Sequence, residues 1–183
     1  MRKSIISSNE DLKEQLLKLG GIVDMFSKND NSSLSIWNHW LKSTEEILKK
    51  YNYSEASEVS GLRSQLLITD VDSKQKRNKR KSNFRRYLKT IAPAQTVVLH
   101  LQKSLEIKIE NTRDIVKQLI IAADQLEVLE SKNGANLNLH IDYLFIKLEQ
   151  NEQLKPAVKN AFSILGKFDT IRLMAEELIG EPQ

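Results

Sequence analysis

The sequence predicts an all-α protein built as a helical bundle, and three observations support that class. Apolar residues recur three and four positions apart through most of the chain, which is the spacing of one helix face. Only six glycines and three prolines occur in 183 residues. Hydrophobic residues make up 40% of the chain and charged residues 28%, so it can bury a core beneath a solvated surface.

The first 69 residues predict an N-terminal subdomain of three helices, over 11–26, 36–51 and 54–68. Asn9 suits the N-cap of the first helix. The three apolar faces consist of Leu12, Leu16, Leu19, Val23 and Phe26, then Trp37, Trp40, Leu41, Leu48 and Tyr51, then Ala56, Val59, Leu62, Leu66 and Leu67. Because Trp37 and Trp40 share the spacing of their apolar neighbours, we interpret them as core residues rather than a binding platform.

A dense block of positive charge follows, with nine cations among residues 74–89. They are Lys74, Lys76, Arg77, Lys79, Arg80, Lys81, Arg85, Arg86 and Lys89. The chain has 28 basic and 24 acidic residues, so without these nine its net charge of +4 would become −5. The positive balance is therefore local, which indicates a polyanion or an acidic protein surface as partner.

The basic block divides into two predicted parts. Its second part has apolar residues at helical spacing, namely Phe84, Tyr87, Leu88 and Ile91. Continuing that helix toward the N-terminus would place Arg77 and Arg80 on its apolar face. We therefore predict a loop over 70–81, a helix that starts near Ser82, and a basic linker at 70–82.

The remaining residues predict a C-terminal helical bundle over 83–183, built on a long helix at about 94–131 that Pro93 introduces. The apolar seam of this helix comprises Val98, Leu101, Leu105, Ile109, Thr112, Val116, Leu119, Ala123 and Leu126. Its length suggests a coiled coil or a helical hairpin. The segment Lys132-Asn133-Gly134 is a suitable stop.

Two further helices complete the predicted bundle. The first carries Leu137, Ile141, Leu144, Phe145 and Leu148 on one face. The second starts at Pro156, contains Gly166, and has a seam of Ala161, Ile164, Phe168, Ile171, Ala175 and Leu178. Residues 105–110 and 137–145 also alternate with period two, so the alternative fold is α+β with a strand–helix–strand unit in 97–145. Seams longer than a typical strand favour helices.

These elements predict an N-terminal helical subdomain at 1–69, the basic linker at 70–82 and the C-terminal bundle at 83–183, or one continuous domain. No cysteine is present, which excludes a disulfide framework, a thiolate zinc site and thiol catalysis. No apolar run approaches the roughly 18 residues of a membrane span, so we expect no membrane partner. The N-terminus lacks the apolar core of a secretion signal. We predict a soluble, cytoplasmic protein, or a nuclear one in a eukaryote.

Candidate catalytic and metal-binding groups are few. His39, His100 and His140 are scattered and lack metal-ligand spacing. The adjacent pairs Glu45-Glu46 and Glu176-Glu177 point about 100° apart on a helix, so we interpret them as solvated charge. Phosphate-binding, dinucleotide-binding and nucleophile-elbow motifs are also missing. We predict no enzyme, no metal and no cofactor.

Residues 54–70 resemble a helix-turn-helix in part. Ser57, Gly61 and Leu67 fit its small residue, turn glycine and aliphatic position, whereas Ser60 and Asp70 do not fit. A recognition helix here would present Arg63, Ser64 and Gln65 to base edges. The match is incomplete and depends on the neighbouring basic block.

The sequence therefore favours a non-enzymatic nucleic-acid-binding protein that contacts the phosphate backbone through 74–89. Phe84 and Tyr87 could stack on bases, but their helical spacing favours core packing. Two other interpretations of the block remain: a nuclear-localisation pattern at Lys76-Arg77-Asn78-Lys79, and a solvated linker. The alternative function is that of a structural protein that assembles with itself or a helical partner through 94–131.

Overall fold

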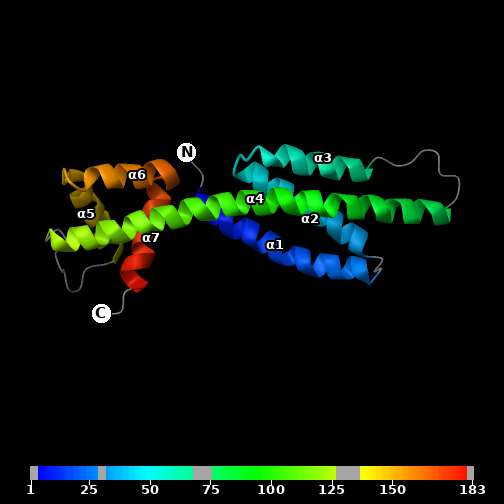
Figure 1. The fold of residues 1–183 in the computed structure, drawn as a ribbon, viewed down its shortest axis with the longest axis horizontal. Coiled ribbons are helices and arrows are strands. Elements are labelled where there is room, and N and C mark those ends of the chain that lie inside the picture. The colour runs from blue at the N-terminus through cyan, green and yellow to red at the C-terminus, as the bar shows by residue number, and fades with distance from the viewer. Residues whose placement is uncertain (1–3, 29–31, 68–75, 127–136, 181–183) are drawn as a thin grey trace. The chain divides into compact units, whose positions relative to one another are not determined.

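The computed structural model describes residues 4–28, 32–67, 76–126 and 137–180, and these ranges contain seven α-helices and no strand (Figure 1). In chain order the helices are α1 (Ile5–Ser27), α2 (Ser33–Lys50), α3 (Glu55–Leu67), α4 (Lys76–Gln125), α5 (Leu137–Gln150), α6 (Lys155–Leu165) and α7 (Lys167–Gly180). The all-α class is confirmed for the described residues. The α+β alternative is not supported, because 105–110 and 137–145 are both helical.

The chain packs as two compact units. The α1–α4 unit consists of Ser7–Ser104, and the C-terminal unit consists of Met1–Ile6 with Leu105–Gln183. Both α1 and α4 contribute residues to each unit. The domain assignment made from the sequence, with bounds at 1–69, 70–82 and 83–183, stays a prediction.

Two stacked tryptophans occupy the core of the α1–α4 unit. Trp37 and Trp40 are buried, and their ring centroids lie 4.9 Å apart. The indole N–H of Trp37 donates to Thr90 Oγ1 at 3.0 Å on α4, and that of Trp40 donates to the Gln15 carbonyl at 2.9 Å on α1. Each ring therefore buries its apolar body with its donor satisfied, which confirms the core interpretation.

The predicted faces of α1 and α2 are largely buried in this unit. Leu12, Leu19 and Phe26 face the core, as expected. Val23 is 43% exposed, and the adjacent Ile22 is buried in its place. Neighbouring aliphatic residues differ by about 100° in direction, so a small rotation of the helix decides which of them is buried.

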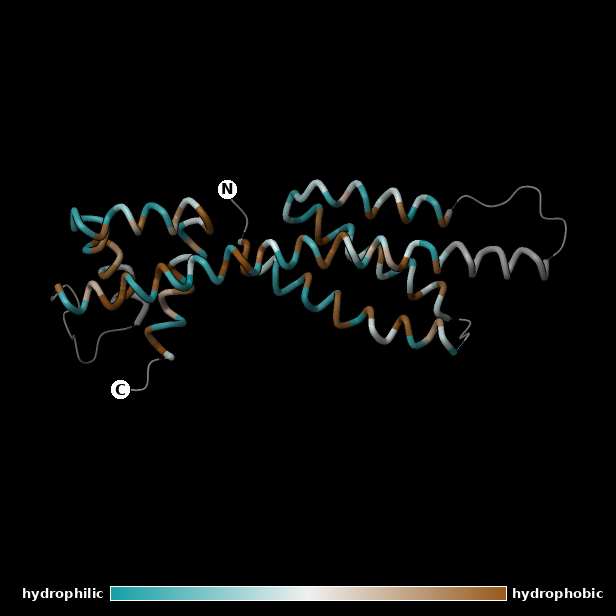
Figure 2. The backbone as a smooth tube through the Cα atoms, in the orientation of Figure 1, coloured by the Kyte–Doolittle hydropathy of each residue, from teal (hydrophilic) through white to brown (hydrophobic). Residues whose placement is uncertain are grey.

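The C-terminal unit has a continuous apolar core to which α4, α5, α6 and α7 contribute, together with Ile6 at the start of α1. It contains Val116, Leu119 and Ala123 of α4, Leu144, Phe145 and Leu148 of α5, Val158 and Leu165 of α6, and Leu173 and Met174 of α7. Figure 2 shows hydrophobic and hydrophilic residues alternating along these helices, as amphipathic packing requires. The predicted face of α5 is buried from Ile141 to Leu148.

Asp169 caps the N-terminus of α1 within this unit. Its carboxylate accepts hydrogen bonds from Ser4 Oγ at 2.6 Å, from the Ile5 backbone N–H at 2.5 Å and from the Ile6 backbone N–H at 3.3 Å. These N–H groups have no partner inside their own helix. Asp169 also lies in the first turn of α7, so one negative charge lies at the positive ends of two helix dipoles.

Helix α4 differs from the predicted helix at both ends. It begins at Lys76 rather than near 94, and it ends at Gln125 rather than at 131. Its predicted seam is buried at Val98, Leu101, Leu105, Ile109, Thr112, Val116, Leu119 and Ala123. Leu126 lies just past the helix end and is exposed. The predicted stop at 132–134 lies outside the described residues.

Pro93 lies inside α4 and does not start a new helix. Proline removes the bond to the carbonyl of Lys89, four residues earlier. Both residues are on the exposed side of the helix, where water can bond to that carbonyl. Thr90, Ala94 and Val98 are buried on the other side, so core packing holds the helix together across the proline.

The last predicted helix is two helices, because Gly166 separates α6 from α7. Gly166 has φ 92° and ψ 156°, a conformation available essentially to glycine alone. The break changes the register of the buried face. Phe168, predicted in the core, is 74% exposed, and Leu173 and Met174 are buried instead.

Candidate nucleic-acid interface

The basic residues predicted to bind nucleic acid lie on the first turns of α4. The backbone is helical from Lys76 onward, so the loop predicted over 70–81 is wrong from that residue. Lys74 and the rest of 70–75 lie outside the described residues. Eight of the nine cations are on α4. The side chain of Lys89 is described and is exposed. For the other seven the backbone alone is described: Lys76, Arg77, Lys79, Arg80, Lys81, Arg85 and Arg86.

Helices α1 and α2 both have an end near Tyr87 of α4. The ring of Tyr87 lies 6.5 Å from that of Phe26, and α1 ends one residue later at Ser27. Trp37 bonds Thr90, and α2 begins four residues before Trp37, at Ser33. Helix α4 continues toward its N-terminus beyond these ends (Figure 1). The predicted loop assumed that packed helices extend alongside Arg77 and Arg80, whereas α1 and α2 have their ends near Tyr87.

The described apolar residues of the basic block are divided between core and surface. Tyr87 is half-buried against Phe26, which agrees with the predicted core packing. Leu88 is 45% exposed, contrary to the prediction. The side chain of Phe84 lies outside the described set. Stacking on bases would therefore require Tyr87 to leave its contact with Phe26.

The first half of α4 contains no compensating carboxylate. Its first turn has no acidic residue, and Glu106 is the first acid along the helix. Positive charge near a helix N-terminus opposes the helix dipole, and like charges three or four residues apart repel. The basic turns of α4 thus combine high charge density with no acidic neighbour on their own helix.

The helix-turn-helix interpretation is wrong. Helix α3 runs without interruption through Gly61, where the motif requires a turn. Arg63, expected to read bases, lies with its Nε 3.0 Å from Oε2 of the buried Glu45. Neither of these two atoms has a hydrogen-bond partner, so the contact is an ion pair without a well-formed hydrogen bond. Arg63 therefore acts in an ion pair that joins α2 to α3.

Glu45 is the one buried carboxylate among the described residues of the α1–α4 unit. It accepts a hydrogen bond from Lys49 Nζ at 2.5 Å. That bond, opposed by burial and assisted by the charge of Arg63, lowers the pKa of Glu45 below its ordinary value. The neighbouring Glu46 is exposed and 3.9 Å from Lys42. The two carboxylates point apart as predicted, but Glu45 is a paired internal charge and not a solvated one.

The second pair of adjacent carboxylates converges on one cation, contrary to the prediction. Arg113 of α4 donates to Glu177 at 2.6 Å and to Glu176 at 3.5 Å, and Glu110 lies 3.8 Å away. Burial alone would lower the pKa of Arg113, but the bond to Glu177 and the three negative charges outweigh it and raise that pKa. The long arginine reaches both carboxylates, which a rule based on their directions alone does not anticipate.

The described histidines lie apart from one another. His39 and His100 are exposed on different helices, and the side chain of His140 is outside the described set. Among the described side chains, no group of three or more His, Asp or Glu could hold a metal ion. None of the described helices combines the length and the hydropathy that crossing a membrane requires.

The sequence matches no protein-family model, and comparisons with curated proteins and with solved structures give no significant match.

Proposed function

We propose that this protein binds nucleic acid through the basic segment 74–89 and does not act as an enzyme. The observation that carries the proposal is the segregation of charge, with nine cations in this segment of a chain that would otherwise have a net charge of −5. By contrast, the ion pairs of Glu45 and of Arg113 each join a cation to a carboxylate. The basic turns of α4 have no acid on the same helix before Glu106.

The proposed mechanism is neutralisation of backbone phosphates. Each lysine or arginine that contacts a phosphate displaces condensed counterions, and their release favours binding without sequence preference. Arg85, Arg86 and Lys89 lie nearest the packed part of α4, so we propose that they orient the nucleic acid relative to the bundle. The more N-terminal cations extend the contact along the backbone.

A charge-neutralised variant tests this proposal. Lys76, Arg77, Lys79, Arg80 and Lys81 are changed together to Gln, and binding to labelled DNA and RNA is followed by fluorescence anisotropy between about 50 and 200 mM salt. Loss of five phosphate contacts should weaken binding at least tenfold and flatten the dependence on salt. An affinity that does not respond to salt, or no binding to any DNA or RNA, overturns the proposal.

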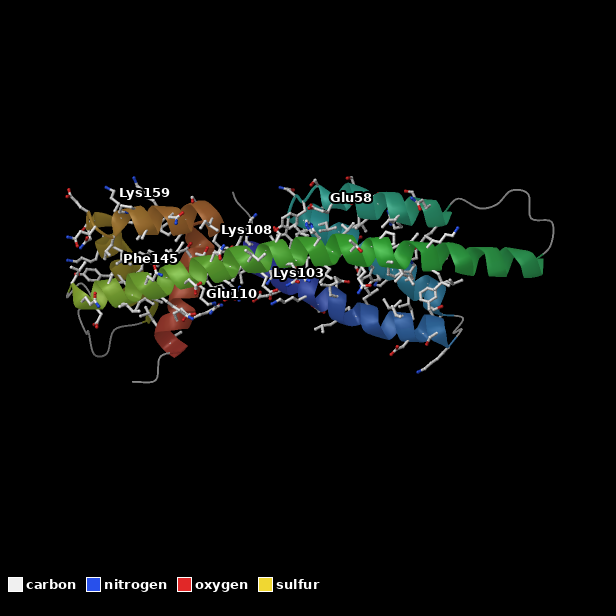
Figure 3. All side chains as sticks on the ribbon, in the orientation of Figure 1. Glu58, Lys103, Lys108, Glu110, Phe145 and Lys159 are labelled. Atoms are coloured by element: carbon white, nitrogen blue, oxygen red, sulfur yellow. The ribbon has the colours of Figure 1, made fainter. Side chains whose placement is uncertain are left out.

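A matched control removes the same charge elsewhere. Five exposed lysines for which no ion pair is observed serve this purpose, namely Lys28, Lys103, Lys108, Lys155 and Lys159. Three of them, Lys103, Lys108 and Lys159, are labelled in Figure 3. Changing these five to Gln should alter the affinity far less than the first variant does. An equal loss would show that net charge, and not the basic segment, determines binding.

A second candidate function is assembly with itself or a helical partner through α4. The seam that suggested it is buried within the chain, from Val98 to Ala123. A partner would therefore meet the outer side of α4, where Ile107 and Ile121 are exposed large apolar residues. Light scattering over a concentration series tests self-assembly: a mass that grows with concentration, and that falls for Ile121→Lys, supports it. A constant monomer mass contradicts it.

A further inference from the structure

We infer that the nucleic acid is double-stranded DNA and that residues 76–89 of α4 dock as a helix in its major groove. This inference rests on the proposed function and narrows it to one substrate class and one geometry. It depends on three features of α4: its continuity with the packed bundle, the early end of its neighbours, and the distribution of its cations around the helix.

The first turns of α4 have the shape that a groove accepts. A single helix with its side chains is about 10–12 Å across, and the major groove of B-form DNA is about 12 Å wide. A helix can enter it only where other helices do not flank it. Helices α1 and α2 have their ends close to Tyr87, at Ser27 and Ser33, and α4 extends past them (Figure 1). The bundle would remain outside the groove while its basic extension entered.

The register positions of the cations are spread around the helix and do not form one stripe. At about 100° per residue, counted from Lys76, their register positions occupy every quarter of the circumference. By quarter they are Lys76 and Arg80, Arg77 and Lys81, Arg85 and Lys89, and Arg86 and Lys79. A flat anionic surface would neutralise only one side of such a helix. The major groove has phosphates along both walls, so it can neutralise several sides at once.

The same charges connect binding to helix stability. Like charges four residues apart, such as Lys76 with Arg80 and Arg77 with Lys81, weaken a helix in water, and cations at its N-terminus oppose its dipole. Phosphates on both sides remove that repulsion. The helical content of this segment should therefore increase when duplex DNA binds.

Other nucleic acids fit this arrangement less well. The major groove of A-form RNA is deep and narrow, and a helix cannot enter it as it enters B-form DNA. Single strands are held by aromatic side chains that stack on bases. Tyr87 is half-buried against Phe26 and so is not presented for stacking.

The first experiment measures affinity of the full chain for four probes of equal length: duplex DNA, duplex RNA, single-stranded DNA and heparin. The protein should bind duplex DNA at least tenfold more tightly than duplex RNA or single-stranded DNA. Its helical content, measured by circular dichroism, should rise when duplex DNA binds. The slope of log affinity against log salt should be steep, up to about −7 if all eight cations of 76–89 contact phosphates. Equal or tighter binding to duplex RNA or single strands overturns the inference and leaves the proposed function standing. Binding to heparin alone overturns both.

The second experiment separates helix from charge. Ser82→Pro keeps every cation but interrupts the helix, and Ser82→Ala is its matched control. We expect the proline variant to lose at least tenfold in duplex affinity, and the alanine variant to bind within about twofold of the wild type. Tryptophan fluorescence checks that the bundle containing Trp37 and Trp40 remains folded. A proline variant that binds duplex DNA like the wild type overturns the helical geometry.

Chemical protection identifies the groove. Dimethyl sulfate methylates guanine N7 in the major groove and adenine N3 in the minor groove. Bound protein should protect guanine N7 and leave adenine N3 reactive. Protection confined to adenine N3 overturns the major-groove assignment even if duplex DNA is preferred.

Discussion

Replacing Asp169 should destabilise the C-terminal unit by an amount that depends on what is removed. The carboxylate accepts hydrogen bonds from Ser4, Ile5 and Ile6 at the start of α1 and lies in the first turn of α7. Asp169→Asn keeps one oxygen for the backbone N–H groups, and its amide can donate to the Ser4 hydroxyl. Asp169→Ala removes the acceptor of all three hydrogen bonds.

The expected magnitudes follow from these contacts. The asparagine variant loses mainly the interaction of a negative charge with helix N-termini, which is typically 0.3–1 and at most about 2 kcal/mol. We expect a loss of about 1 kcal/mol in the free energy of unfolding. The alanine variant also loses hydrogen bonds to a charged acceptor, each about 1.5–3 kcal/mol, although Ser4 and Ile5 are only partly buried and water can replace some of this. We expect about 3 kcal/mol.

Urea unfolding followed by circular dichroism measures both variants, and hydrogen exchange at the Ile5 and Ile6 amides localises the effect. Asp114→Asn, at an exposed position on α4 in the same unit, is the matched control and should change stability by less than about 0.5 kcal/mol. If both Asp169 variants unfold like the control, or if hydrogen exchange at Ile5 and Ile6 is unchanged, Asp169 does not stabilise the start of α1.

Three further substitutions test other parts of the structure. Because the pKa of Glu45 is lowered by folding, its ion pairs stabilise the protein above the ordinary carboxyl pKa, and that contribution is lost as the pH falls through the folded-state value. Glu45→Gln should therefore reduce stability near pH 7, and the difference from the wild type should shrink as the pH falls below the ordinary carboxyl pKa in urea titrations; a difference independent of pH contradicts this. Trp37→Phe removes the bond to Thr90 and leaves a cavity, so we expect a loss of about 2–3 kcal/mol by chemical denaturation, and an unchanged midpoint would show that the contact contributes little. Gly166→Ala forces a side chain into a glycine-only conformation and should cost about 2 kcal/mol, unlike Gly61→Ala within α3, which should be neutral or stabilising.

Much of the fold could be predicted because apolar residues three and four positions apart lie on one helix face, which is the face that becomes buried. The seam of α4 from Val98 to Ala123 is buried at every predicted position, since a long amphipathic pattern has little freedom of register. A short amphipathic pattern leaves the register of the helix less well determined. The seam drawn through Gly166 placed Phe168 in the core because spacing alone does not show a positive φ. At Pro93 the sequence predicted the start of a new helix, but α4 continues through this residue. Packing around Thr90 and Ala94 stabilises the helix where local preference alone would end it.

The candidate site was visible in the sequence as a charge excess, but its conformation was not. The predicted loop followed from the assumption that Arg77 and Arg80 would face a core. No such constraint applies, because the ends of α1 and α2 lie close to Tyr87. The buried pair of Glu45 and Arg63 was missed for a similar reason. Only the Lys49 four residues after Glu45 hinted at it, and the contact to α3 depends on tertiary structure.

The division of the chain into two units inside α4 limits how it can be rearranged by evolution or by the experimenter. The boundary between Ser104 and Leu105 lies within a continuous helix and not in a loop. Fusion or duplication of one unit alone would leave a truncated helix, with buried leucines such as Leu101 or Leu105 at its cut end. Modules that are exchanged between proteins are usually bounded by exposed linkers. A cut at this boundary is therefore expected to damage the core of both units, so neither unit should be transferable without the part of α4 that belongs to the other.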